Sequence, residues 1–342
     1  MIRYPPPLAP GDVVGVASPS AGVAPQHAAR LDLAVRHVED AGLRVRLGAL
    51  VHGAGIASGP ADDRVDELTG MFRDPDVRAV VPPWGGEIAL DLLGRLDLRA
   101  LAEDPTWFVG YSDISTLLLP LTLTTGVATL HGQNLMDTPY RVPAPMAQWL
   151  DVVRLAPGST LVQGAAPRVA SGRLADYAAD PGVRDYPLDA PGGWTRVDAD
   201  ESEDVHATGR LVGGCLETVA HLAGTPSGDI GRFVAEHAPE GTVVYLEAAA
   251  ADAADVARRL LGLRHAGWFE AARAVLVGRT RGADLPGFTQ HDAVRHALGD
   301  LGVPVLVDVD CGHVPPHLAL VNGALATVEH SGAGSVLTQT LR

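Results

Sequence analysis

The stretch from residue 106 to residue 119 reads TWFVGYSDISTLLL. It begins as a continuous apolar run, passes through Gly-Tyr-Ser-Asp and continues as a run of leucines. The first run predicts a strand that is buried on both faces, and the second predicts a helix that begins beside Ser112. A strand that leads through one turn into a helix is the repeating unit of a parallel α/β sheet. The stretch therefore predicts an α/β fold with Ser112 at the carboxyl end of a strand.

The same alternation of strand and helix continues on both sides of this stretch. On the N-terminal side, the pattern predicts strands at 12–17, 43–47 and 77–82 and helices at 26–41, 64–72 and 88–93. On the C-terminal side, after a strand at 128–130, it resumes beyond Gly209 with strands at 210–212, 242–246, 274–277 and 305–309 and helices at 216–222, 251–261 and 293–298. We therefore expect two α/β lobes, each built on a parallel sheet.

The pattern divides the chain into three parts. Residues 1–156 form the predicted N-terminal lobe, which carries Ser112, and residues 205–342 form the predicted C-terminal lobe. Between them, residues 157–204 are rich in Pro, Gly and Asp, so we expect a linker with surface loops there. Near the end of the chain, Asn322-Gly323 separates two apolar runs and predicts a hairpin turn.

The composition excludes several classes of function. The 342 residues carry 26 basic and 41 acidic side chains, which gives a net charge of −15, so we expect neither nucleic acid nor an anionic membrane as a partner. The chain contains no lysine, and all 26 basic residues are therefore arginine. This excludes a Schiff-base or pyridoxal phosphate lysine, a Ser–Lys dyad and a phosphate-loop lysine.

The cysteines and the apolar runs lead us to expect a soluble, cytoplasmic protein. Cys215 and Cys311 are the only cysteines, and they form no CxxC pair, so we expect neither a disulfide scaffold nor a zinc ribbon. The first residues show no signal-peptide pattern. The longest uncharged run, 114–130, is interrupted by Pro120 and Gly126 and is poorly suited to span a membrane.

Ser112 is the first candidate for catalysis. A strand that ends in Gly-x-Ser before a helix resembles a nucleophile elbow, which exposes the serine hydroxyl on a sharp turn. The amide of Asp113 would then be free to face an oxyanion. The last Gly of the G-x-S-x-G pattern is absent, because Ile114 stands there. Alternatively, Ser112 is an ordinary helix N-cap.

Gly85-Gly86 is a second candidate, again between a predicted strand and a predicted helix. Two glycines allow close approach of the backbone and positive φ angles, so this pair could supply a second oxyanion amide or hold a phosphate. Alternatively, it is a plain tight turn. The dinucleotide fingerprint G-x-G-x-x-G is missing here and after the first strand, and we expect no cofactor.

Two further candidates follow strands of the C-terminal lobe. Glu247 ends an apolar strand and is followed only by alanines, so it either faces water or orients a base. The segment 308–317, DVDCGHVPPH, has three interpretations: a metal site of Asp308, Asp310, His313 and His317; a Cys311/His313 dyad; or a single base, His313. Pro315-Pro316 excludes the helix that would place two histidines on one face, so we expect no metal.

Ser112, Glu247 and His313 each follow the carboxyl end of a predicted parallel strand, where α/β proteins place their sites. A serine needs an adjacent base, and the base needs an acid that holds its tautomer. The three residues are therefore interpreted together as nucleophile, acid and base.

Seven blocks of this sequence, in order, resemble the LD-carboxypeptidase family of serine peptidases, which includes the microcin C immunity peptidases. The blocks are GDVVGVASPSAG, PPWGGEIALDLL, FVGYSDISTLL, TLHGQNLMD, GRLVGGCLETVAHLAGT, VVYLE and VDVDCGHVPPHLALVNGALATV. The resemblance implies a Rossmann-like N-terminal lobe with a parallel sheet, a C-terminal α/β lobe, and an active site in the cleft between them. It also implies a Ser–His–Glu triad of Ser112, His313 and Glu247, an oxyanion hole of the Gly86 and Asp113 amides, and a homodimer.

The resemblance leaves the substrate open. It implies release of D-alanine from murein tetrapeptide, with a peptidyl- or aminoacyl-nucleotide toxin of the microcin C type as the alternative substrate. A non-catalytic protein that binds a small anion is an alternative of another class. Many family members carry further acids after the triad Glu, whereas Glu247 is followed by Ala248-Ala249-Ala250. Gly85 and Trp194 are the predicted substrate contacts; Trp194 either stacks on a purine or anchors the linker in the interior.

Overall fold

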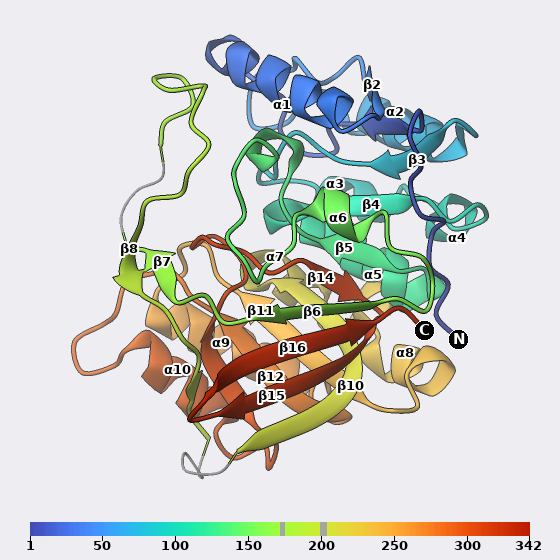
Figure 1. The fold of residues 1–342 in the computed structure, drawn as a ribbon. Coiled ribbons are helices and arrows are strands. Elements are labelled where there is room, and N and C mark those ends of the chain that lie inside the picture. The colour runs from blue at the N-terminus through green and yellow to red at the C-terminus, as the bar shows by residue number, and fades with distance from the viewer. Residues whose placement is uncertain (172–174, 199–203) are drawn as a thin grey trace.

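The computed structural model describes residues 1–171, 175–198 and 204–342. Within them the chain forms two lobes, each built on one sheet, and Figure 1 shows the lobes stacked along the long direction of the molecule. The predicted two-lobe α/β fold is confirmed. None of the helices in the described residues has the length and apolar character needed to cross a membrane.

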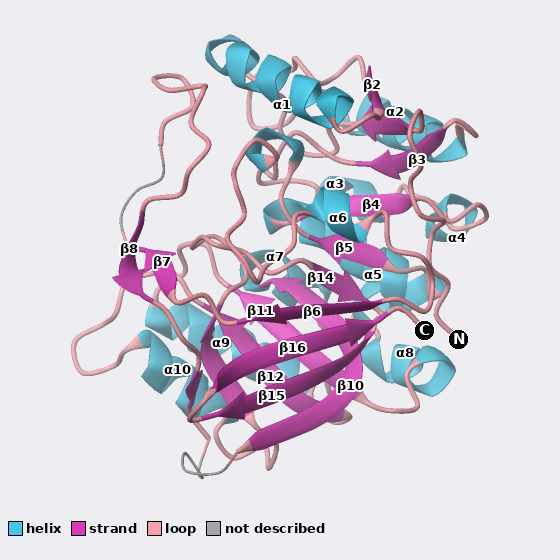
Figure 2. Cartoon of the chain, viewed as in Figure 1, coloured by secondary structure: helices cyan, strands magenta, loops and turns pink. Residues whose placement is uncertain are grey.

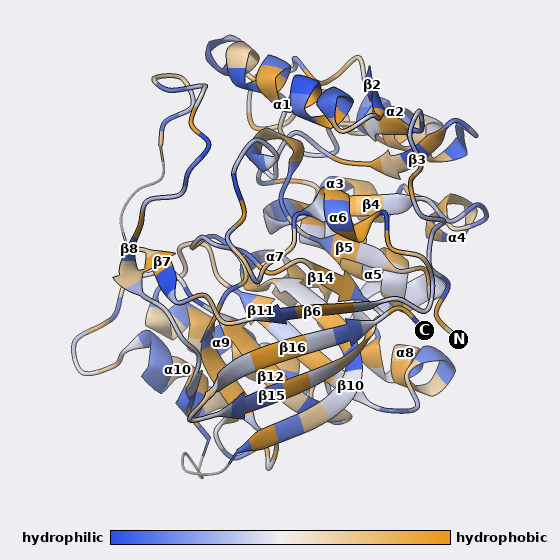
Figure 3. Cartoon of the chain, viewed as in Figure 1, coloured by the Kyte–Doolittle hydropathy of each residue, from blue (hydrophilic) through white to orange (hydrophobic). Residues whose placement is uncertain are grey.

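The sheet of the N-terminal lobe has the strand order β14-β5-β4-β3-β1-β2. Five of its strands are parallel: β1 (Val13–Val16), β2 (Arg44–Leu47), β3 (Val77–Val80), β4 (Trp107–Gly110) and β5 (Thr129–His131). The helices of this lobe are α1 (Ala28–Asp40), α2 (Ala61–Arg73), α3 (Leu90–Leu93), α4 (Leu98–Leu101), α5 (Ser115–Thr125) and α6 (Trp149–Val152), with 3₁₀ turns at Pro25–His27, Ser112–Ile114 and Leu135–Asp137. The surface helix α1 carries both polar and apolar stretches in Figure 3, because one of its faces is buried.

The sheet of the C-terminal lobe has the order β6-β16-β15-β10-β11-β12-β13-β9. Its parallel centre consists of β10 (Val205–Cys215), β11 (Thr242–Glu247), β12 (Ala272–Gly278) and β13 (Val305–Val309). The helices are α7 (Leu216–Val219), α8 (Ile230–His237), α9 (Ala253–His265) and α10 (Gln290–Leu298), with 3₁₀ turns at Ala220–Leu222 and Pro226–Gly228. Helices α9 and α10 lie beside each other at the end of the lobe near β7 and β8 (Figure 2).

The described residues of the segment 157–204, which was expected to be linker and loops, contain four short strands. Strand β6 (Thr160–Gly164) pairs with β16 (Gly334–Thr340), and β9 (Thr195–Arg196) pairs with β13, so this segment supplies both edges of the larger sheet. Strands β7 (Arg168–Ala170) and β8 (Leu188–Pro191) form a separate two-stranded sheet. The expectation of loops is wrong for these residues, because edge strands of two to five residues give too little alternation to stand out among Pro and Gly.

The predicted hairpin at Asn322-Gly323 is also wrong. Strand β14 (Leu320–Asn322) pairs antiparallel with β5 of the other lobe, and the true hairpin joins β15 (Leu325–Ser331) to β16. The Asn322 side chain is fully buried: it accepts hydrogen bonds from the Gly213 amide and the Tyr245 hydroxyl and donates one to Thr129 Oγ1. The residue therefore links the two lobes instead of making a surface turn.

Helix α5 occupies the junction between the lobes. It contacts β10, α7 and α8 of the C-terminal lobe as well as its own sheet, and its residues from Ser115 to Leu123 are buried. This position explains why helix α5 has no charged residue and lacks the polar stripe of a surface helix.

Candidate active site

The turn after β4 carries Ser112 in a strained conformation. Its φ angle is +63°, and among the described residues only Ser112 and Asp308 combine a side chain with positive φ. Such a conformation costs about 1–3 kcal/mol and occurs mainly where function requires it. The sharp turn places the serine between the end of β4 and the first turn of α5, which is the geometry predicted for an elbow.

His313 and Glu247 reach Ser112 from the other lobe. His313 Nε2 lies 3.0 Å from Ser112 Oγ, and His313 Nδ1 lies 2.8 Å from Glu247 Oε2. Glu247 ends β11, and His313 lies in the loop after β13, so the two strands deliver their side chains to one point. Gly312 makes this approach possible: its φ is +93°, and a Cβ there would lie 2.2 Å from Glu247 Oε2.

The electrostatics of this pair favour an ionised acid and a basic imidazole. Burial alone raises the pKa of Glu247, but the neighbouring His313 and His131 outweigh it and hold that pKa well below its usual range. Burial lowers the pKa of His313, yet the negative charge of Glu247 prevails and leaves that pKa above its ordinary value. An ionised Glu247 holds the proton of His313 on Nδ1 and leaves Nε2 free to accept a proton from Ser112.

The glycine pair lies directly against the serine. A Cβ on Gly85 would lie 2.9 Å from Ser112 Oγ and 3.2 Å from the Asp113 amide nitrogen. Gly86 has a φ of +146°, and a Cβ on it would lie 2.2 Å from Ser20 Oγ. The Asp113 carboxylate is buried and accepts hydrogen bonds from Ser20 Oγ (2.5 Å) and the Ala89 amide (2.8 Å), so it holds these loops together.

The alanines after Glu247 are held by a neighbouring acid. The carboxylate of Glu217 accepts hydrogen bonds from the amides of Ala249, Ala250 and Ala251 at 2.9 to 3.1 Å. Glu217 itself follows β10 at the start of α7. It therefore shapes the turn after the strand that presents Glu247, although this turn has no side-chain carboxylate of its own.

The other residues of the 308–317 segment have separate partners. Asp310 is fully buried, forms an ion pair with Arg279, and accepts hydrogen bonds from Trp194 Nε1 at 2.8 Å and the Ala166 amide at 3.0 Å. Asp308 pairs with His291 on α10. These two acids do not meet His313, so the four-residue metal site considered from the sequence is not assembled.

Trp194 lies in the interior. Its side chain is 6% exposed and packs in a core cluster with Val205 and Leu306 while its indole binds Asp310. The geometry is that of an anchor for the segment before β9. It does not support the predicted contact of Trp194 with a substrate, since little of the ring faces outward.

Sequence reasoning missed His131 and Tyr111 beside His313, and it considered His317 only as a metal ligand. His131 ends β5, and its Nε2 lies 3.8 Å from Glu247 Oε1. Tyr111 lies 5.1 Å from the His313 ring, and its hydroxyl donates to Asp137. His317 is buried, and burial together with the nearby His313 lowers its pKa to about 3, so it is neutral. The position of His131 directly after a predicted strand was the available signal.

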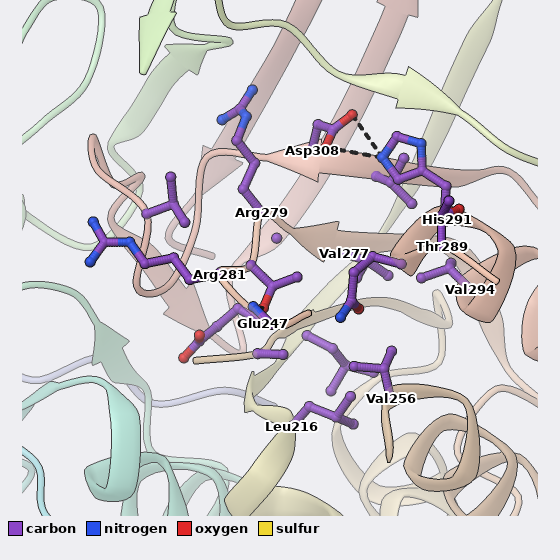
Figure 4. Close-up of a pocket in the computed structure, with 18 of the residues that line it drawn as sticks. Leu216, Glu247, Val256, Val277, Arg279, Arg281, Thr289, His291, Val294 and Asp308 are labelled. Carbon is purple, nitrogen blue, oxygen red and sulfur yellow. Dashed lines mark hydrogen bonds and ion pairs between the residues drawn. The ribbon is translucent and has the colours of Figure 1, made fainter. Parts of the chain in front are cut away.

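A cavity of about 820 Å³ lies beside Glu247 at the carboxyl ends of β11, β12 and β13. Figure 4 shows Glu247 and Arg281 extending toward the same side of this cavity, with the Asp308–His291 pair at the opposite side. The apolar part of the cavity wall is formed by Leu216, Val256, Val277 and Val294. The volume and the mixed lining are typical of a small-molecule site, and of Ser112, His313 and Glu247 only Glu247 is among the lining residues.

Comparisons with known proteins agree with the sequence resemblance. Residues 14–132 match the model of the LD-carboxypeptidase N-terminal domain, and residues 208–328 match that of the LD-carboxypeptidase C-terminal domain. A probable murein peptide carboxypeptidase of Bacillus subtilis is 37% identical over 36% of this chain and 39% of its own length. The microcin C7 self-immunity protein MccF of Escherichia coli is 23% identical over 97% of this chain and 95% of its own.

The fold agrees as well. The solved structure of MccF in complex with glutamyl sulfamoyl guanosine superimposes with a TM-score of 0.79 at 20% identity, covering 99% of this chain and 98% of MccF. At 20% identity the similarity to MccF is a similarity of fold, and it covers both lobes of this chain.

Proposed function

Because the chain belongs to the LD-carboxypeptidase family, we propose that it is a serine carboxypeptidase that hydrolyses an amide next to a terminal carboxylate. The observation that carries the proposal is the continuous hydrogen-bonded series from Ser112 through His313 to Glu247, with links of 3.0 and 2.8 Å. A serine, an imidazole and a carboxylate in this order are the components of nucleophilic acyl transfer.

In the proposed mechanism, Ser112 Oγ attacks the carbonyl carbon while His313 Nε2 takes its proton. The Gly86 and Asp113 amides donate hydrogen bonds to the oxyanion that forms. His313 then returns the proton to the leaving amine, the C–N bond breaks, and an acyl-enzyme remains on Ser112. Water activated by His313 hydrolyses this ester and restores the serine. Throughout, Glu247 holds the imidazole and stabilises its positive charge.

As the leading substrate we propose murein tetrapeptide, from which the enzyme would release D-alanine. The similarity to a murein peptide carboxypeptidase supports this choice. The chain has no lysine, and Arg281, on the cavity beside Glu247, is a suitable cation for the substrate carboxylate. No cofactor takes part in this chemistry.

An aminoacyl- or peptidyl-nucleotide is the second candidate substrate. The near full-length similarity to MccF and a group of rings beside His313 favour it. The rings are those of Tyr111, Tyr140, Tyr177, Tyr186 and His317, each within 6.2 Å of another member of the group. Within this group Tyr140, Tyr186 and His317 are buried, so the partly exposed rings of Tyr111 and Tyr177 are the faces that can stack on a nucleobase.

A hydrolysis panel tests the proposal and chooses between the substrates. Purified protein is incubated with murein tetrapeptide and, separately, with an aminoacyl-sulfamoyl adenosine, and the released amino acid is quantified. We expect turnover of the tetrapeptide; turnover of the nucleotide alone would transfer the assignment to the second candidate. A fluorophosphonate label provides the check on enzyme class. A protein that binds a small anion without catalysis would leave Ser112 unlabelled and both substrates intact.

The activity should depend on pH through His313. Only the neutral imidazole accepts a proton, so kcat/KM is expected to fall as the pH drops through the His313 pKa. Because Glu247, helped by Glu217 and Asp137, raises that pKa, the midpoint should lie above about 6.5, the ordinary value for histidine. A pH–rate profile measures it. A midpoint below 6 would contradict the proposed pairing of His313 with an ionised Glu247.

A further inference from the structure

A buried thiol lies beside the proposed acid and base. Cys215 is the last residue of β10, is 2% exposed and pairs in register with Glu247 on β11. One potential ligand atom from each of Cys215, Glu247 and His313 lies within 4.8 Å of the other two. The proposed hydrolysis assigns no role to this thiol.

These three side chains are a donor set that suits zinc. Zinc binds thiolate, imidazole and carboxylate ligands in a tetrahedral arrangement, and three protein ligands leave a fourth position open for water. The ligand atoms of such a site lie roughly 3.3–3.8 Å apart, as follows from its bond lengths. The group within 4.8 Å therefore needs only a small inward movement of its side chains.

The surroundings of Glu247 leave room for another interaction. Glu247 is fully buried, and its Oε1 has no hydrogen-bond donor among the described residues; His131 Nε2 lies 3.8 Å from this oxygen. An unpaired carboxylate oxygen in the interior is costly, and a bound cation would satisfy it. His313, whose side chain is 23% exposed, provides the approach from solvent.

We propose that Cys215, Glu247 and His313 form an inhibitory site for a thiophilic divalent cation such as Zn²⁺. The inhibition rests on the proposed function, because the ion would occupy the acid and the base. Binding displaces the thiol proton to solvent; in the free protein that thiol donates to Glu217 Oε2 at 3.4 Å. The negative charges of the Cys215 thiolate and the Glu247 carboxylate then balance the double positive charge of the ion.

The ion blocks catalysis through the imidazole. If it binds Nε2, it takes the lone pair that Ser112 requires. If it binds Nδ1, the neutral ring carries its remaining proton on Nε2, which is then a donor and cannot accept the serine proton. The ion also neutralises Glu247 and so withdraws its support for the imidazolium. Removing metal should therefore leave the enzyme fully active.

Inhibition measurements test this site. Enzyme freed of metal by EDTA and exchanged into metal-free buffer is assayed with increasing Zn²⁺, and EDTA is then added. We expect full activity before zinc, loss of activity with zinc, and recovery with EDTA.

The variant Cys215→Ala tests the role of the thiol. The zinc concentration that halves its activity, measured against that variant's own zinc-free rate, should rise by at least about tenfold, because a ligand is lost. Cys311→Ala is the matched control: Cys311 is also a buried free cysteine but does not belong to the group, so its zinc sensitivity should stay that of the wild type.

Metal binding is measured separately from activity with Co²⁺. A thiolate-to-cobalt charge-transfer band is expected in the wild type and in Cys311→Ala and should be absent in Cys215→Ala. A wild type without this band, or a Cys215→Ala variant with unchanged zinc sensitivity, would overturn the proposed site. If the band appears and depends on Cys215 while no substrate of the panel is hydrolysed, the metal site stands and the proposed function fails.

Discussion

Ser112→Ala is expected to lower kcat on the leading substrate by a factor on the order of 10⁶, the scale seen when a catalytic serine is removed. The change deletes one hydroxyl, whose hydrogen bond is to His313, and leaves the backbone turn in place. Steady-state or single-turnover kinetics measure the loss, and thermal unfolding checks that the variant is folded.

The combination with His313→Ala sharpens this prediction. Members of a triad act as a unit, so His313→Ala and the double variant should be about as inactive as Ser112→Ala alone. Additive losses, or more than a few per cent of wild-type activity in the serine variant, would remove Ser112 from the role of nucleophile.

Glu247→Gln is expected to lower kcat by a factor on the order of 10⁴, as the comparable change does in a serine protease. The amide retains the approximate geometry, but it lacks the negative charge that stabilises the imidazolium, and its nitrogen can hold the wrong tautomer of His313. If Glu247 were merely an acid at a strand end, the cost would be within about 0.5 kcal/mol, or roughly twofold. One kinetic measurement separates these outcomes.

Glu217→Gln is the matched control for this change. Glu217 is a second carboxylate beside the site, but its partners are backbone amides and the Cys215 thiol. The control should therefore lose far less activity than Glu247→Gln. Near wild-type rates in Glu247→Gln would instead direct the search for the acid to Glu217, because Asp310, the other acid suggested by the sequence, is paired with Arg279 away from His313.

The pH profile connects both variants to the electrostatics of the site. The raised pKa of His313 depends on Glu247, so the acidic midpoint of the residual activity in Glu247→Gln should move to lower pH. A midpoint that stays in place would show that another group sets the basicity of the imidazole.

Local patterns in the sequence were sufficient for much of the fold. The largely apolar runs at 106–109, 242–246 and 305–309 correspond to β4, β11 and β13, because strands covered on both faces are mostly apolar. The same patterns place Ser112, Glu247 and His313 after strand ends, since in parallel sheets these ends gather on one edge. The spacing of strands and helices thus indicates the two lobes, and the residue types at the strand ends, together with the family resemblance, indicate the candidate residues.

Only the tertiary structure decided which of these residues meet. Ser112 and His313 are 201 positions apart, and the turn at Gly312 allows His313 to reach both partners, which no local pattern encodes.

Other contacts between distant segments were equally outside the reach of local patterns. Strand β14 joins the sheet of the other lobe, and the buried Trp194 indole donates a hydrogen bond to Asp310. The amides of Ala249 to Ala251, which follow β11, donate hydrogen bonds to Glu217, which follows the neighbouring strand β10. Strand propensity and turn chemistry act over a few residues, whereas pairing partners, burial of polar groups and the convergence of side chains depend on contacts between distant segments. The sequence by itself determined the alternating strands and helices of both lobes and the edge where a site would form; the packing of the two lobes determined the site.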